Sequence, residues 1–164
     1  MPLPLRRIAL LVFAAWWGGL TIYAAIVVPV GADVLDATTQ GFVTRRVTHW
    51  LNGLAGVAAA AALTEWWGTG RRAAAVTALL LAVTLLILVP IHHQLDRLLD
   101  VRTLSVSDPD RFYLWHRVYL WVTTVQWLAG LAHLWGLIAS PHVGVDRQEF
   151  PGPGESGQTG EVVA

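Results

Sequence analysis

Four long apolar segments constrain the fold of this chain more than any other feature of its sequence. The first and third carry no charged residue, the second carries Glu65 near its end, and the fourth carries no charge after Arg117. A helix needs about 20 predominantly apolar residues to cross the hydrocarbon core of a bilayer. The sequence therefore predicts an all-α protein, a bundle of four transmembrane helices. The predicted spans cover residues 8–30, 47–67, 73–93 and 112–140.

The composition agrees with an integral membrane protein and excludes several kinds of site. Charged residues make up only 13% of the chain, against the roughly 25% that is usual in soluble domains. The formal net charge is zero and no basic arm or stripe is present, so the lipid bilayer is an expected partner and nucleic acid is not. The chain has no cysteine, which excludes disulfides, thiolate-bound zinc, iron–sulfur clusters and covalently attached haem.

The placement of arginine predicts the orientation of the spans. Two arginines precede the first span, and two more fill the short turn between the second and third spans. Cytoplasmic loops carry an excess of positive residues, so these ends should lie inside. We expect a multi-pass protein of the cell membrane with both termini cytoplasmic, although a further pair in the first outer loop opposes this orientation. The three pairs are Arg6 and Arg7, Arg71 and Arg72, and Arg45 and Arg46.

The chain divides into a membrane domain and a C-terminal tail. Residues 1–140 contain all four predicted spans. Residues 141–164 are rich in proline and glycine and poor in apolar residues, a composition typical of disorder. We expect this tail to be disordered and to have no function of its own.

Histidines gather at the predicted outer ends of the spans. His49 begins the second span, His92 and His93 end the third, and His116 begins the fourth. His92, Asp96 and Asp100 are spaced four residues apart and would share one helix face. Adjacent residues on a helix point about 100° apart, so only one of the paired histidines can face inward. We predict that this is His92, that it lies near His49 or His116, and that His93 faces solvent or headgroups.

The polar residues of the fourth span fall on a single stripe. They repeat every three or four residues, the period of a helix face that stays against a neighbour. We expect this stripe to face the bundle interior, and Leu120, Val125 and Leu128 to face lipid. A hydrogen bond from His133 to a neighbouring helix and an ion pair between Glu65 and the arginines after it are also expected. The stripe consists of His116, Tyr119, Thr123, Gln126, Gly130 and His133.

Three short motifs resemble those of a known family of small four-span membrane proteins. They are VVPVGADVL at the end of the first span, VPIHHQLD at the end of the third, and YLWHRVYLWVTTVQW at the start of the fourth. Together they resemble the anthrone-oxygenase-like family, in which an Asn–Asn pair commonly stands where this chain has His92 and His93. The resemblance implies oxidation of a polyphenolic anthrone to a quinone by molecular oxygen, without an identified cofactor. The motif positions would be Pro90, His92, His93, Trp115, His116 and Arg117.

Three kinds of function fit these residues. In an oxidoreductase or oxygenase acting on an apolar aromatic molecule, neutral His92 or His116 would take an acidic proton, because imidazole titrates near physiological pH. Asp96 would orient His92, and Arg117 would stabilise an enolate. A non-enzymatic accessory subunit or small-molecule binder needs none of these roles. A metal- or haem-binding bundle would draw its ligands from His49, His92, His93 and His116, and an interfacial helix end would use the histidines only as polar boundary residues.

Overall fold

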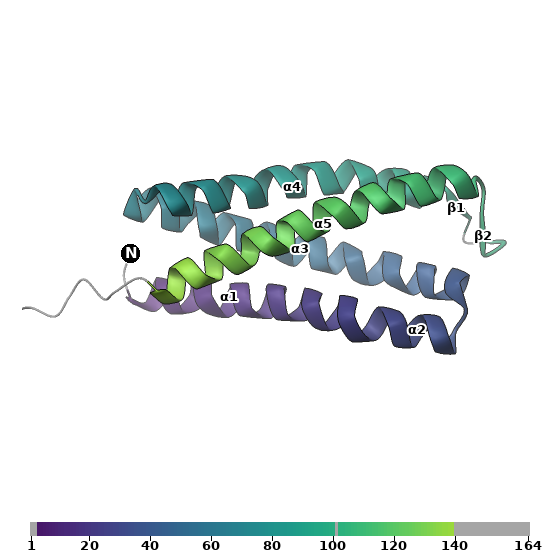
Figure 1. Cartoon of the computed structure of the whole chain (residues 1–164), viewed down its shortest axis with the longest axis horizontal. Helices are drawn as coiled ribbons and strands as arrows, with labels where there is room; N and C mark the ends of the chain where they lie inside the picture. Colours follow the sequence, from purple (N-terminus) through teal and green to yellow (C-terminus); the bar gives the residue numbers. More distant parts are fainter. Residues whose placement is uncertain (1–2, 101, 140–164) are drawn as a thin grey trace, which may run out of the picture.

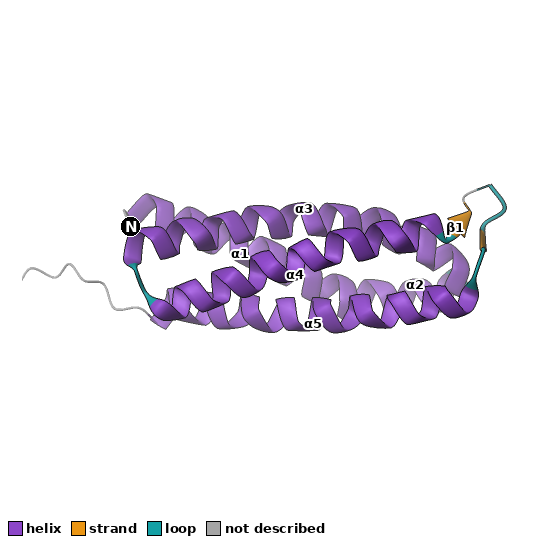
Figure 2. Cartoon of the chain, turned by 90° about the horizontal axis from the view of Figure 1, so that it is seen from above, coloured by secondary structure: helices purple, strands orange, loops and turns teal. Residues whose placement is uncertain are grey.

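Helices account for nearly all of the described chain, which comprises residues 3–100 and 102–139 of a computed structural model (Figure 1). Four helical rods lie side by side, and each packs against two neighbours (Figure 2). The N-terminal rod packs against α3 (Ala37–Thr69) and α5 (Pro109–Ala139), and so does α4 (Arg72–Arg97). Because α3 and α5 therefore stand at opposite corners, a contact between them crosses the interior of the bundle. The all-α prediction is confirmed.

The N-terminal rod contains a single widened turn, which a proline explains. It consists of α1 (Leu3–Ile22), the π-helical turn η1 (Tyr23–Val27) and α2 (Val28–Val34). Pro29 has no N–H to donate, and its ring clashes with the carbonyl four residues before it in a regular α-helix. The chain relieves this clash by one π turn, in which the Val28 N–H donates to the carbonyl of Tyr23, five residues earlier.

The second rod, α3, begins and ends at residues suited to those positions. At its start, the Asp36 carboxylate accepts hydrogen bonds from the backbone N–H groups of Thr38 and Thr39, at 2.9 and 3.0 Å. The hydrogen bond from Thr39 is the main reason that the pKa of Asp36 is lowered. At its end, Gly70 adopts a left-handed conformation with φ of 63°. The helix starts ten residues before the predicted span 47–67 because the Asp36 cap lies in the preceding turn.

The last two rods are joined by a small hairpin. Strand β1 (Leu99–Asp100) pairs antiparallel with β2 (Ser105–Val106), in the register Leu99 to Val106 and Asp100 to Ser105. The Asp100 carboxylate accepts the Arg102 N–H at 2.8 Å, and this hydrogen bond is the main reason that the pKa of Asp100 is lowered. The hairpin lies at the same end of the bundle as the turn between α2 and α3 (Figure 1).

Apolar side chains cover the outside of the bundle as well as its inside. Large buried side chains such as Phe13, Trp16 and Leu81 form the core, while Leu11, Leu86 and Trp121 are among many large apolar side chains that are exposed. A soluble protein rarely exposes so much contiguous apolar surface, whereas a surface in contact with lipid is apolar by necessity. Small core residues on α3 allow close packing of helix backbones. They are Ala55, Ala58, Ala59 and Ala62.

Three helical segments are long and apolar enough to cross a membrane. They are Arg6–Val34, Arg72–Arg97 and Pro109–Ala139, which contain the first and third predicted spans and all but the last residue of the fourth. The helix α3, which contains the predicted span 47–67, is not one of them, since its polar and small residues lower its hydropathy. The fourth crossing thus stays a prediction. The tail 141–164 lies outside the described residues.

Candidate functional site

Three of the predicted polar positions lie together at the end of the bundle that carries the β1–β2 hairpin, the end predicted to face outward (Figure 1). The ring centroids of His49 on α3 and His92 on α4 are 6.4 Å apart, and those of His92 and Tyr119 on α5 are 6.2 Å apart. His92 is half-buried and His93 is exposed. The predicted inward position of His92, its proximity to His49 and the outward position of His93 are all confirmed.

An arginine from α3 completes this group. The Arg45 Nε atom lies 2.6 Å from Asp96 Oδ1, and His92 Nε2 lies 3.8 Å from the other carboxylate oxygen. Asp96 therefore lies between a guanidinium and an imidazole. We refer to Arg45, His49, His92, Asp96 and Tyr119 as the outer cluster. Arg45 was read from the sequence only as a topology signal, but its spacing of four residues from His49 already places both on one face of a helix.

Polar groups continue from the outer cluster into the interior. The Tyr119 hydroxyl donates to Asn52 Oδ1 at 3.3 Å, a contact that joins α5 to α3 across the bundle. Further in, the Tyr23 hydroxyl and the Gln126 Nε2 atom are buried and have no hydrogen-bond partner among the described residues. Buried polar groups are nearly always hydrogen-bonded, so these two atoms have hydrogen-bonding capacity that the described residues do not use.

Two predicted site residues lie apart from the outer cluster. The His116 ring stacks on Phe112 of its own helix, with centroids 5.8 Å apart, and none of the contacts among the described residues joins it to His92. Arg117 is exposed on α5. Within residues 3–100 and 102–139, no group of three or more histidine or carboxylate side chains is arranged to hold a metal ion. The metal site built from His49, His92, His93 and His116 stays a prediction.

The predicted polar stripe of α5 faces the interior. Tyr119, Gln126, Gly130 and His133 are buried, whereas Leu120, Val125 and Leu128 are exposed. Packing favours a glycine at position 130 for a steric reason. A Cβ atom at this position would lie 2.6 Å from Cζ3 of the buried Trp16. The glycine thus sets how closely α5 approaches α1.

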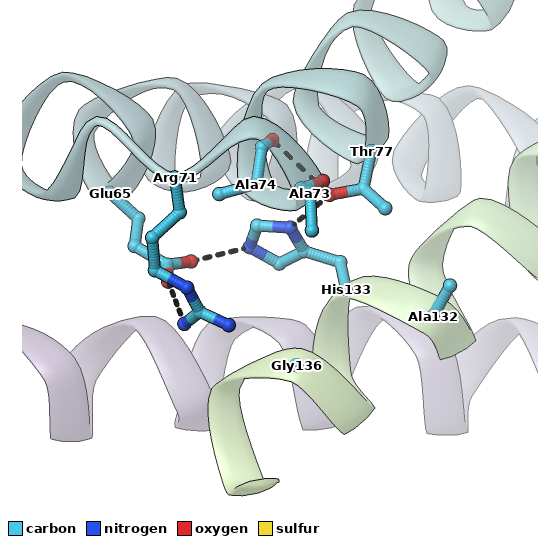
Figure 3. A pocket seen from close by; sticks show the side chains of 8 residues that line it. All are labelled: Glu65, Arg71, Ala73, Ala74, Thr77, Ala132, His133 and Gly136. Carbon is cyan, nitrogen blue, oxygen red and sulfur yellow. Dashed lines mark hydrogen bonds and ion pairs between the residues drawn. The ribbon is translucent and has the colours of Figure 1, made fainter. Parts of the chain in front are cut away.

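A second polar group lies around His133 at the opposite end of the bundle, the end predicted to face the cytoplasm (Figure 3). Its Nε2 atom is 2.9 Å from Glu65 Oε2 on α3, and its Nδ1 atom is 2.7 Å from the Thr77 hydroxyl on α4. Arg71 Nη1 lies 3.8 Å from the other oxygen of Glu65. We refer to Glu65, Arg71, Thr77 and His133 as the inner cluster. The predicted hydrogen bond of His133 and the ion pair of Glu65 with Arg71 are both confirmed.

The partnership of Glu65 with His133 was not predicted from the sequence. Both residues lie near the cytoplasmic ends of their predicted spans, so their similar depth was available as a signal. The Phe13 ring of α1 stacks on the His133 ring, with centroids 4.6 Å apart. Beside the ring is a cavity of about 140 Å³. It is lined by the inner cluster and by Ala73, Ala74, Ala132 and Gly136 (Figure 3).

Comparisons of the chain with protein-family models, curated protein sequences and solved structures find no match.

Proposed function

We propose that the chain is a membrane protein with four spans, whose termini and α3–α4 turn are cytoplasmic. Three of the helices have the length and composition of spans. The remaining helix, α3, has 33 residues and is about 50 Å long at 1.5 Å per residue. It lies alongside the other three over the whole bundle and exposes Trp50, Val57 and Trp67 (Figure 2). The paired arginines at the N-terminus and in the α3–α4 turn support the orientation.

The chemistry that the outer cluster supports best is removal of a proton from a weakly acidic, apolar aromatic molecule. The contact between His92 and Asp96, held from the other side by Arg45, is the observation that carries this proposal. At 3.8 Å the two groups are in charge contact and are not hydrogen-bonded; in the proposed reaction the pair closes, Asp96 accepts from Nε2, and Nδ1 is left free to take a proton. The carboxylate also stabilises the imidazolium that results. Asp96 can perform both tasks because the bond to Arg45 fixes its position.

In the proposed reaction, His92 takes a proton from the acidic carbon of an anthrone that enters from the bilayer. The carbanion then gives its electrons to molecular oxygen. The balance is one anthrone and one O₂ giving one quinone and one water, with the His92 proton returned to the departing oxygen. Arg45 is the guanidinium of the outer cluster, so the predicted stabilisation of an enolate by Arg117 is not needed in this scheme.

A non-enzymatic small-molecule binder is the second candidate, and a different observation favours it. The buried Tyr23 hydroxyl and Gln126 amide have hydrogen-bonding capacity that no described residue uses. A bound molecule with polar groups could satisfy both without any reaction. Binding without turnover would distinguish this function from the first.

The test is turnover of an anthrone and of a hydroquinone by the purified full-length chain in lipid vesicles. Quinone absorbance is followed against protein-free vesicles, because anthrones also oxidise spontaneously. Saturable turnover that depends on His92 supports the proposal. Saturable binding of the anthrone with no turnover above the protein-free rate would instead support the binder.

A further inference from the structure

The inner cluster has the geometry of a site that takes up and releases a proton. Its three contacting side chains come from three helices: Glu65 from α3, Thr77 from α4 and His133 from α5 (Figure 3). Glu65 and His133 face each other across opposite corners of the bundle, and both are buried. Any change in their charge must therefore be compensated by the groups that touch them.

One arrangement of protons fits the contacts of the ring while the imidazole is neutral. The ring carries its proton on Nε2, which lies 2.9 Å from Glu65 Oε2 in a close polar contact that does not have hydrogen-bond geometry. The bare Nδ1 accepts the hydroxyl proton of Thr77. With Glu65 ionised, the Nε2 proton lies beside a negative charge.

A second arrangement fits the same contacts with one more proton. The imidazolium keeps its Nε2 proton beside the Glu65 carboxylate and donates from Nδ1 to the Thr77 oxygen. The Thr77 hydroxyl then turns its proton to the carbonyl of Ala73 or Ala74, whose oxygens lie 3.1 and 3.2 Å away. The extra proton is therefore accommodated by the rotation of one hydroxyl group, without a new buried and unpartnered atom.

Among the charged groups around the His133 ring, Glu65 is the one that balances the charge of the added proton. At this end α1 contributes Arg6 and Arg7, and the start of α4 contributes Arg71 and Arg72. Arg6 donates to the carbonyl of Leu137 at the end of α5. Helix α5 has no charged residue after Arg117 within the described chain, and α4 has none between Arg72 and Asp96. The aromatic face of Phe13 also lies against the ring, where it favours a cation.

We propose that the inner cluster is a proton-binding site that exchanges protons with the cytoplasmic side through the cavity at Arg71. The cavity reaches Glu65 and His133, and Arg71, which is exposed, forms part of its lining (Figure 3). Alanine and glycine residues form the rest of the cavity wall. This site lies at the opposite end of the bundle from the outer cluster, and the proposal does not depend on the anthrone chemistry.

The experiment is nitrogen-15 NMR of histidine-labelled full-length protein in lipid nanodiscs, from about pH 5 to pH 8, the range in which histidine changes charge. The His133 signals are assigned by their loss in His133→Asn. In the wild-type protein we expect a ring with its proton on Nε2 at the alkaline end and a ring with both nitrogens protonated at the acidic end. A His133 ring whose protonation is the same throughout this range would overturn the proposal, because the contact would then be a fixed structural bond.

Three variants separate proton binding from packing. Glu65→Gln keeps a hydrogen-bond acceptor for Nε2 but removes the counterion, so the ring should stay neutral over the whole range. Thr77→Val leaves an Nδ1 proton without an acceptor and should reduce the protonated fraction at the acidic end, whereas Thr77→Ser should restore it. Equal protonation in Thr77→Val and Thr77→Ser would contradict the role assigned to the hydroxyl group.

Discussion

The two ends of the bundle each join an imidazole to a carboxylate, but they hold the two groups differently. At the outer end His92 and Asp96 are 3.8 Å apart, and their side chains are 15% and 23% exposed. At the inner end His133 and Glu65 are 2.9 Å apart, and their side chains are 2% and 6% exposed. The outer pair is loose and open enough to meet another molecule. The inner pair is closed by Thr77 and Phe13 and can exchange only a proton or another very small species.

The largest expected effect concerns the outer pair. His92→Leu should reduce anthrone turnover by about 10²–10⁴-fold, the usual contribution of a general base, since leucine cannot accept the proton. His93→Leu is the matched control, because it changes the neighbouring and exposed histidine in the same way. The measurement is quinone formation in vesicles above the protein-free rate. If both variants oxidise the anthrone as fast as the wild type, His92 is not the base and the outer end is only a polar helix terminus.

The free energy of unfolding should distinguish the carboxylate of Glu65 from that of Asp96. Glu65→Leu leaves the neutral His133 ring buried without its partner, and leaving a buried polar group unpaired costs about 1–3 kcal/mol. Asp96→Leu removes a partly exposed pair, for which about 0–1 kcal/mol is expected. The free energy of unfolding in mixed detergent and SDS micelles measures both. Equal losses for the two variants would show that burial at the inner end does not set the strength of its pair.

The contact between Gly130 and Trp16 lies between the two ends of the bundle. Disrupting it should affect the inner cluster more than the outer cluster. Gly130→Ala places a Cβ atom 2.6 Å from the Trp16 ring, and overpacking of this kind costs about 1–3 kcal/mol. Gly53→Ala, at a position with open space around it, should be neutral or slightly stabilising. Unfolding free energies test the pair of variants, and the His133 NMR signals should shift only in Gly130→Ala. A stable Gly130→Ala protein would show that α5 can move away from α1 freely.

The smallest expected effect concerns acid at the start of α3. The folded-state pKa of Asp36 is lowered, so its contribution to stability is present above the ordinary aspartate pKa of about 3.9 and is lost as the pH falls through the lower folded value. Asp36→Asn can still accept hydrogen bonds from the backbone but does not titrate, so its melting temperature should fall less on acidification. Asp33→Asn, an exposed change on α2, is the control and should follow the wild type. Identical acid profiles for all three proteins would mean that the capping charge of Asp36 contributes nothing.

Sequence alone predicted the helices, the inward face of α5 and the division of the histidine pair. These features depend on the local period of a helix, so the spacing of Tyr119, Gln126 and Gly130 was sufficient to identify a buried face. The sequence also placed His49 and His92 at one level, because each lies at the end of an apolar segment of similar length. It did not identify the partners of Asp96 and His133, since Arg45 and Glu65 are distant in the chain and each had a plausible local role.

Tertiary packing determines which helix faces meet and at what depth. Because the three histidines were predicted at one depth, His92 could contact either His49 or His116. In the structure the His92 ring lies beside His49, and the His116 ring lies against Phe112. The reason is that the rotation of one helix against another is set by close contacts far from the polar residues. Gly130 against Trp16 is one such contact, and the alanines of α3 provide others. A hydrophobic period fixes which side of each helix is buried, but the steric fit between helices determines whether an imidazole meets a carboxylate, a ring or lipid.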